Sequence, residues 1–197
     1  MSEKKAVTKN TLNKMFLRCL MFGGSWNYER MQNLGFLYTI LPALKKIYKH
    51  DDKEDLSKAM QRHLEFFNTN QSAQPFILGV TTALEEREKN DGSDTINGLK
   101  IGLMGPLAGL GDSLIWLTLV PICFSLGASY SKTGNFLGVV IALLLVNVIN
   151  VSIKYFGLHF GYTSGSEFFR KAKESGNMEK ITNAAIALGL VLVGGLI

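Results

Sequence analysis

The sequence predicts an all-α integral membrane protein, in which N-terminal amphipathic helices are followed by Gly-rich transmembrane or re-entrant helices. The first observation is a long apolar stretch, because the only charged residues between Ile101 and Ile153 are Asp112 and Lys132. So long an uncharged stretch is typical of helices inside a bilayer. The second observation is the distribution of glycine, since 14 of the 20 glycines follow residue 100. Small residues of this kind let membrane helices approach each other closely.

Composition divides the chain into two regions. Residues 1–100 carry 15 Lys and Arg against 12 Asp and Glu, whereas the rest of the chain carries only 6 against 4. We therefore expect an amphipathic helical region over 1–98, largely at the cytoplasmic interface, and a membrane-embedded region over 99–197. The modest basic surplus is spread among acids, which argues against binding to nucleic acid. The polar N-terminus has no signal-peptide pattern, so insertion depends on the internal apolar segments.

Four helices are expected in the first region, and each start has a capping residue or a proline. The starts are Thr8 or Thr11, Ser25, Asp51 or Asp52, and Pro75. Gly23-Gly24 is expected to end the first helix, and Asn90-Asp91-Gly92 the fourth. Pro42 lies inside the second helix, where it removes a hydrogen bond, so a bend or break is expected between Tyr38 and Pro42.

The second region contains three apolar segments. Leu99–Ala128 is long enough to span a bilayer, although its Gly and Pro residues also allow a re-entrant hairpin. Phe136–Ile153 is the clearest spanning helix, and Ile181–Ile197 begins a third that ends while still apolar, which predicts that the protein continues. If the first segment crosses once and the second returns, the basic regions on either side of them share the cytoplasmic side. We prefer that single crossing.

Asp112 is the most unusual residue of the membrane region, because an ionisable group at that depth is costly and often functional. Its most frequent role after a glycine-rich break would be a helix N-cap, and a role in substrate or proton transfer is the alternative. A structural loop is expected just before it, formed by Gly105, Pro106, Gly109 and Gly111. The segment lacks the Gly-Lys-Ser/Thr ending of a nucleotide-binding loop.

Residues 63–76 bring together amides, a carboxylate and aromatic rings, which are groups that hydrogen-bond to sugar hydroxyls. A helix end that runs into a polar loop is the simpler interpretation of the same residues. Glu85 follows an apolar run and could point inward, but no second acid accompanies it as a paired-carboxylate hydrolase requires. Cys19 and Cys123 lack the spacing of a zinc site and are expected to be buried free thiols.

Four motifs together resemble the IID membrane subunit of the mannose-family sugar phosphotransferase system. They are GGSWNYERMQNLGF (23–36), RHLEFFNT (62–69), GVTTALEE (79–86) and INGLKIGLMGPLAGLGD (96–112). The resemblance covers essentially the whole chain in order. It implies a multi-pass subunit of the bacterial cytoplasmic membrane that pairs with a IIC subunit, with trimers of that pair as the assembly. Family members continue well beyond the equivalent of Ile197.

The resemblance also implies a function. The IIC–IID pair takes up hexoses such as mannose and glucose, and cytoplasmic IIA and IIB components phosphorylate the sugar through their own histidines. No catalytic nucleophile, cofactor or metal is therefore expected on this chain. The residues expected to bind sugar or to shape the pocket are His63, Asn68, Thr69, Glu85, Asn97 and Asp112. Family members also serve as receptors for certain bacteriocins, which the resemblance allows.

Two other classes of protein remain as alternatives. The chain could be a membrane scaffold that organises a partner transporter without contacting substrate. It could also be an enzyme with an intramembrane acid, although only Lys132, Asn147 and Asn150 offer a second polar group at that depth. Replacing Asp112 and Asn68 separates a transport site from a scaffold, because only a transport site loses uptake while the complex stays assembled.

Overall fold

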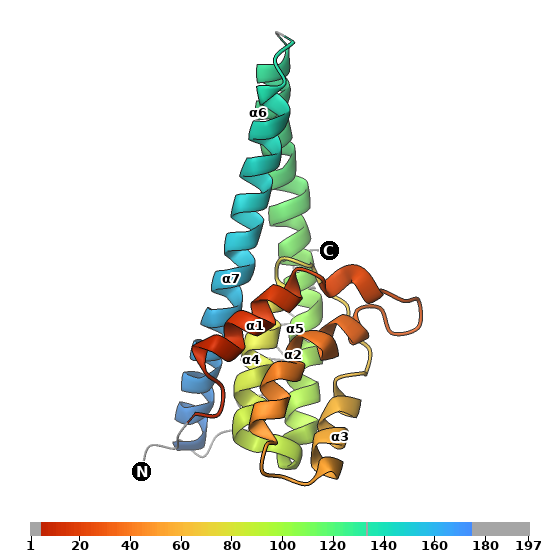
Figure 1. Ribbon diagram of the computed structural model, residues 1–197, viewed down its shortest axis with the longest axis vertical. Coiled ribbons are helices and arrows are strands. Elements are labelled where there is room, and N and C mark those ends of the chain that lie inside the picture. The colour runs from red at the N-terminus through yellow and green to blue at the C-terminus, as the bar shows by residue number, and fades with distance from the viewer. Residues whose placement is uncertain (1–4, 133, 175–197) are drawn as a thin grey trace.

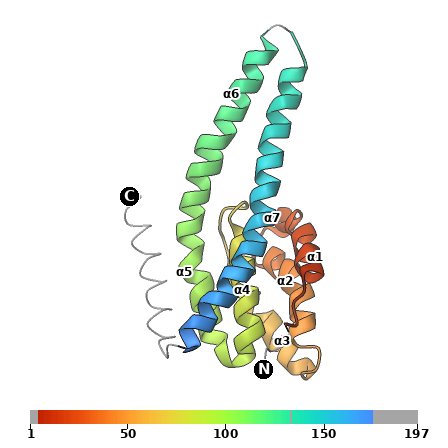
Figure 2. The ribbon, with the colours of Figure 1, turned by 90° about the vertical axis from the view of Figure 1, so that its left-hand side faces the viewer.

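The computed structural model describes residues 5–132 and 134–174. Within these ranges the chain is helical, and it contains two isolated β-bridges but no β-strand. A base of short helices carries a long arm of two antiparallel helices (Figures 1 and 2). The elements in chain order are α1 (Lys9–Cys19), η1 (Phe22–Ser25), α2 (Asn33–Ile47), α3 (Lys53–Arg62), α4 (Gln74–Glu88), η2 (Lys89–Gly92), α5 (Ser93–Gly111), η3 (Asp112–Leu119), α6 (Val120–Ser131) and α7 (Leu137–Glu174).

Local capping explains where the first and fourth helices begin. The Thr8 side chain accepts a hydrogen bond from the Thr11 backbone N–H, as predicted for the start of α1. Pro75 lies in the first turn of α4, where its missing N–H costs nothing. Asp52 stands at the N-cap position of α3, although its side chain makes no capping bond there. α1 ends at Cys19, before the predicted Gly23-Gly24, which lie in η1.

The structure contradicts the predicted start of the second helix, and of the bend or break expected at Pro42 it excludes the break. α2 begins at Asn33 and not after Ser25, because residues 26–32 form a tight turn in which Asn27 and Met31 exchange backbone hydrogen bonds. α2 also runs through Pro42 without a break. Pro42 leaves the carbonyl of Tyr38 without its helical donor, and Arg18 Nη1 of α1 donates to that oxygen at 2.8 Å. A tertiary contact therefore replaces the missing bond.

The predicted structural loop was also wrong. Gly105, Pro106, Gly109 and Gly111 lie inside α5, and the chain passes from α5 through η3 into α6 as one rod without a re-entrant turn (Figure 1). η3 is a π-helix, in which the Thr118 hydroxyl donates to the Ser113 carbonyl five residues earlier. Pro121 follows directly, and its ring needs space while its missing N–H leaves one backbone carbonyl without a donor. The wider π-helical turn therefore lies where the helix must accommodate a proline.

Aromatic and aliphatic side chains from α1, α2 and α4 fill the core of the base. Phe36 packs against Phe67 with ring centroids 4.5 Å apart, and Phe22 lies beside Phe67 at 6.2 Å. All three rings are buried. Cys19 and Cys123 are buried free thiols, as predicted. This core fixes the polar segment between α3 and α4 against α5.

Glycine lets α4 and α7 cross in close contact. A Cβ added at Gly161 would meet the backbone of Phe76, and one added at Gly79 would meet the backbone of Leu158 and Tyr162. Gly157, one turn before Gly161 on α7, has only ordinary contact distances of 3.7 Å and more around such a Cβ. The two helices are therefore held at a distance that only glycine allows at the crossing.

The arm comprises residues 112–131 and 137–156, and most of its large apolar side chains are exposed. Trp116, Leu117, Leu144 and Val148 are among them. The helical stretches 74–131 and 137–165 each contain a window long and apolar enough to cross a membrane, with mean hydropathies of 1.7 and 2.2. α7 begins at Leu137, close to the predicted start at Phe136. The third predicted apolar segment, Ile181–Ile197, lies outside the described residues.

We predict that Gly161→Ala lowers the stability of the protein, because the new methyl group forces the α4 and α7 backbones apart at a cost of about 1–3 kcal/mol. Gly157→Ala, on the same face of α7, is the matched control and should leave the melting temperature close to that of the unmodified protein. Thermal unfolding in lipid nanodiscs measures both. Equal melting temperatures for the two variants would show that the crossing does not depend on glycine.

Candidate functional site

A buried carboxylate organises the polar interior of the base. Glu85 on α4 is fully buried, and both of its oxygens are saturated with hydrogen bonds. Oε1 accepts from Arg62 Nε at 2.9 Å and from His63 Nε2 at 2.7 Å. Oε2 accepts from the Tyr48 hydroxyl at 3.0 Å and from Arg62 Nη2 at 3.1 Å. Since burying an unpaired charge is costly, this set of donors is what permits a carboxylate here.

Arg62 uses its remaining donors to join further elements to Glu85. Its Nη2 also donates to Asn90 Oδ1, and its Nη1 donates to Ser93 Oγ at the start of α5. The Arg62 backbone carbonyl accepts from Lys100 Nζ on α5 at 3.1 Å. The network therefore ties α2, α3, α4 and α5 together through one guanidinium.

Burial lowers the pKa of His63 to about 4, against the opposing effect of the neighbouring Glu85 carboxylate. His63 is therefore neutral at pH 7 and donates its Nε2 proton to Glu85, while its buried Nδ1 has no partner within the described residues. Burial also raises the pKa of Tyr48, which stays a neutral donor. For Arg62 burial acts to lower the pKa, but the hydrogen bonds and charge of Glu85 outweigh it and hold the pKa above its usual value.

The segment of residues 64–73, between α3 and α4, is held by side chains from three other elements. Gln32, just before α2, pairs with Thr69, donating to its carbonyl at 2.9 Å and accepting from its N–H at 3.1 Å. The Thr69 hydroxyl donates to the Met104 carbonyl on α5. Ser72 Oγ donates to Asn150 Oδ1 on α7 at 2.7 Å. A loop with so many fixed contacts presents its side chains in a set geometry.

Asn70 connects this segment to Asp112. Its Nδ2 donates to Asp112 Oδ1 at 2.7 Å, and its Oδ1 accepts from the backbone N–H of Ser72 at 2.8 Å. A Cβ at Gly111 would lie 2.5 Å from the Asn70 side chain, so a glycine is required where Asn70 reaches α5. Asp112 is thus oriented by a neighbouring amide and not by capping a helix.

A polar pocket of about 250 Å³ opens at this point. We call it the Asp112 pocket, and its lining residues are Asn68, Thr69, Asn70, Gln71, Ala108, Asp112 and Trp116. Amide and carboxylate groups therefore face an exposed indole ring. This combination offers both donors and acceptors to a hydroxylated ligand and an apolar surface for its ring.

The structure divides the six predicted site residues among three places. Asn68, Thr69 and Asp112 line the Asp112 pocket. His63 and Glu85 are fully buried in the network behind it, where they hold other residues in position. Asn97 lies on α5 outside both, with its Oδ1 buried and without a partner among the described residues.

Asp112 is not the helix N-cap that its glycine-rich surroundings predicted. It has φ −65° and ψ −44° inside the continuous rod, so its backbone is helical. The N–H groups that a cap would have bound are already paired along the rod. The Asp112 side chain instead accepts the hydrogen bond from Asn70 and lines the pocket.

Sequence reasoning missed Arg62, Tyr48 and Trp116. The signal for Arg62 was present, because a Glu expected to point inward needs a buried cation, and RHLEFFNT supplies Arg62 beside His63. Tyr48 and Trp116 carried no local signal, since each reaches its site only through the packing of separate helices. Within the described residues, no group of three His, Cys, Asp or Glu side chains is placed to hold a metal ion.

Comparison with known proteins identifies close relatives. A family model described as the IID component of the mannose/fructose/sorbose family of PTS systems matches residues 6–197. The mannose-specific EIID component of Escherichia coli (strain K12) is 41% identical over 199 residues, which cover 98% of this chain and 69% of that protein. The fructose permease IID component of Bacillus subtilis (strain 168) is 42% identical over 201 residues, covering 100% of this chain and 72% of the relative.

Solved structures agree with these relatives. A chain in the cryo-EM structure of the mannose transporter ManYZ in complex with microcin E492 has a TM-score of 0.87 and 40% identity, covering 98% of this chain and 71% of that one. A second solved chain, described as a membrane protein, has a TM-score of 0.75 and 41% identity over 98% of this chain. The arrangement of base and arm is therefore shared.

We predict that Glu85→Gln destabilises the protein by about 3–5 kcal/mol, because it leaves the buried guanidinium of Arg62 without a counter-charge. Glu88→Gln is the matched control, since Glu88 lies on the same helix and, among the described residues, forms an ion pair only with the partly exposed Arg87 at 3.4 Å. Its effect should stay within about 0.5 kcal/mol. Thermal unfolding of both variants in nanodiscs is the measurement. A loss in E85Q no larger than in E88Q would contradict the role given to the network.

Stability should also fall on acidification because of His63. Its pKa is about 4 in the folded chain and 6.5 for an unperturbed histidine, so the unfolded chain binds the extra proton between these values. The contribution of neutral His63 to the free energy of unfolding is therefore fully present above pH 6.5. It is lost as the pH falls towards 4, by up to about 3 kcal/mol. Melting temperatures across this range, compared with those of His63→Gln, provide the measurement. The variant should show a shallower decline, and parallel curves would refute the assignment.

Proposed function

The chain belongs to the family of IID components of PTS mannose/fructose/sorbose systems, and we propose that, together with a IIC subunit, it takes up a hexose that cytoplasmic IIA and IIB components phosphorylate. The family match and the two 41–42% identical relatives support this role. The chain itself supplies membrane helices and a polar pocket. The phosphate-transfer chemistry belongs to its partners.

We place the arm across the cytoplasmic membrane as a helical hairpin. The 19 uncharged residues between Asp112 and Lys132 extend for about 30 Å as a helix, which is the thickness of the hydrocarbon core. Exposed apolar side chains on both helices of the arm suit contact with lipid or with the IIC subunit. The base, with its net positive charge, then lies on the cytoplasmic side.

The Asp112 pocket is the proposed sugar-facing surface of this subunit. The single observation that supports it best is the convergence of Asn68, Asn70 and Asp112 beside the exposed ring of Trp116. Asp112 has a free oxygen for a sugar hydroxyl, because only its Oδ1 is bonded to Asn70 among the described contacts. The pocket is open, so the IIC subunit would close its other side.

The remaining predicted residues have supporting roles in this proposal. His63 and Glu85 fix the end of α3 and hence the start of the segment that carries Asn68 and Thr69. Asn97 keeps its predicted role of binding sugar or holding the IIC-side pocket in shape, and its buried oxygen without a partner among the described residues supports that role. A scaffold without substrate contact would need none of the polar groups at the Asp112 pocket.

A second role follows from one of the solved relatives. The structure of that mannose transporter contains microcin E492 bound to it. The high TM-score of 0.87 supports the proposal that this chain also contributes to a bacteriocin receptor. Bacteriocin sensitivity of cells that express the chain with its IIC partner tests that role separately from sugar uptake.

We predict that Asp112→Asn reduces hexose uptake by about 10-fold or more, because a hydrogen bond to a charged group is worth more than one to a neutral amide. The side-chain shape and the acceptor for Asn70 are retained, so the complex with IIC should still assemble. Asn68→Ala should lower uptake in the same way. Uptake of labelled mannose, glucose and fructose into cells, with co-purification of IIC, is the measurement.

Asn147→Ala is the matched control for these variants, since Asn147 lies on the arm outside the pocket. Within the part of the chain that the structure describes, its side chain donates only to the Leu143 carbonyl of its own helix. It should retain uptake. Full uptake in D112N and N68A would overturn the sugar-facing role. Lost assembly in both variants would support the scaffold instead.

A further inference from the structure

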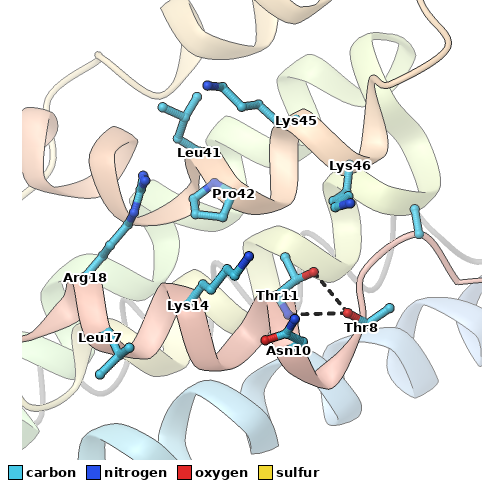
Figure 3. A pocket seen from close by; sticks show the side chains of 11 residues that line it. Thr8, Asn10, Thr11, Lys14, Leu17, Arg18, Leu41, Pro42, Lys45 and Lys46 are labelled. Carbon is cyan, nitrogen blue, oxygen red and sulfur yellow. Dashed lines mark hydrogen bonds between the residues drawn. The ribbon is translucent and has the colours of Figure 1, made fainter.

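A groove of about 580 Å³ lies between α1 and α2, and it shares no lining residue with the Asp112 pocket. Figure 3 shows its lining, with Lys14 and Arg18 coming from α1 and Lys45 and Lys46 from α2. Thr8, Asn10 and Thr11 at the start of α1 add polar groups at one end. Leu17, Leu41 and Pro42 form the apolar part of its wall.

The groove has four cations and no acid among its lining residues. Within the described part of the chain, Lys14, Lys45 and Lys46 form no side-chain hydrogen bond or ion pair. Arg18 differs from the lysines because it already has partners within the protein. It donates to the Tyr38 carbonyl, and its guanidinium lies 4.5 Å from the centre of the Tyr38 ring. Three lysines thus share a concave surface without a counter-charge, which is unfavourable unless an anion joins them.

An exposed apolar surface continues from the groove along the end of α1 and into the loop that follows it. Leu17, Leu20 and Met21 at the end of α1 are exposed to 63%, 49% and 70%. Trp26 and Tyr28 follow in the next loop, both exposed, with their rings 4.8 Å apart. Exposed aromatic and aliphatic side chains next to basic ones are typical of segments at a membrane surface.

The end of α1 lies at the foot of the arm. Phe16 packs edge-on against Tyr155 of α7 at 5.2 Å between ring centroids, and Tyr155 is at the end of the arm nearest the base. The apolar end of α1 is therefore at the depth where the spanning stretch of α7 ends. The beginning of α1 and the end of α2, which carry the lysines, lie further from the arm (Figure 1). This order of apolar and cationic groups matches that of acyl chain and headgroup in a lipid.

We propose that the groove between α1 and α2 binds the headgroup of an anionic phospholipid. The phosphodiester lies between Lys14 of α1 and Lys45 and Lys46 of α2, and the acyl chains extend along Leu17, Leu20 and Met21. A bound lipid then joins the two helices electrostatically and anchors α1 at the membrane surface. An acidic protein segment would match the lysines but would leave the adjoining apolar surface unused, which favours the lipid.

The inference depends on the arm lying in the membrane and not on sugar transport. Lys14 and Lys45 lie outside the Asp112 pocket, so uptake through that pocket and lipid binding are measured independently. Neither lysine supports the fold through a hydrogen bond or ion pair within the described residues. Replacing both is therefore expected to leave the protein folded, and melting temperature in phosphatidylcholine nanodiscs checks this.

The test compares two variants that remove the same charge. Lys14→Gln with Lys45→Gln changes the groove, whereas Lys49→Gln with Lys53→Gln changes exposed lysines outside it. Each is prepared in complex with the IIC subunit, and retained phosphatidylglycerol is measured by native mass spectrometry during titration with that lipid. The groove variant should bind it about 25-fold more weakly, since each of the two lysines near a membrane surface contributes about 5-fold. The control should bind it as the unmodified protein does.

Two further outcomes separate the lipid from other anions. Phosphatidylglycerol should raise the melting temperature of the unmodified complex in phosphatidylcholine nanodiscs, and inorganic phosphate should not. An equal loss of lipid in both variants would overturn the proposal, as would unchanged binding in the groove variant. Displacement of phosphatidylglycerol by a soluble IIB component would also overturn it, because the groove would then be a protein-docking surface.

Discussion

The Glu85 carboxylate is the constraint on which the rest of the base depends. A buried charge must be matched by donors, and the donors come from Tyr48 at the end of α2 and from Arg62 and His63 at the end of α3. Arg62 then reaches Ser93 at the start of α5, while its carbonyl receives Lys100. The ends of four helices are thereby fixed relative to one carboxylate, which apolar packing alone would position less uniquely.

This constraint positions the polar pocket. The segment with Asn68 and Thr69 begins directly after His63, and Gln32, Met104 and Asn150 hold it along its length. Because many of its backbone groups, including those of Phe67 and Thr69, are already bonded, its exposed side chains need little ordering when a ligand arrives. The buried ionic network around Glu85 thus supports the open Asp112 pocket.

Sequence reasoning succeeded where the cause is local. Thr8 caps α1 and Pro75 starts α4, because both effects act within one helical turn. It did not foresee that Arg18 from another helix replaces the hydrogen bond lost at Pro42. It failed at Gly111, whose lack of a side chain admits Asn70 and does not break the rod. The amide-rich composition of residues 63–76 indicated half of the pocket. The other half, with Trp116, becomes visible only when α5 and η3 pack beside that segment.

Asp112 and Glu85 are both acids in polar surroundings, but their environments assign them different roles. Glu85 has four donors on two oxygens and no exposure, so it cannot exchange a partner without leaving Arg62 unpaired. Asp112 is exposed, shares one oxygen with Asn70, and lies at the start of a π-helix, a type of turn often found at functional sites. An acid that is already oriented yet incompletely bonded can accept a hydrogen bond from a passing ligand and release it again. The sugar-binding role proposed for Asp112 requires that reversibility, whereas the saturated carboxylate of Glu85 is suited to holding the helices together.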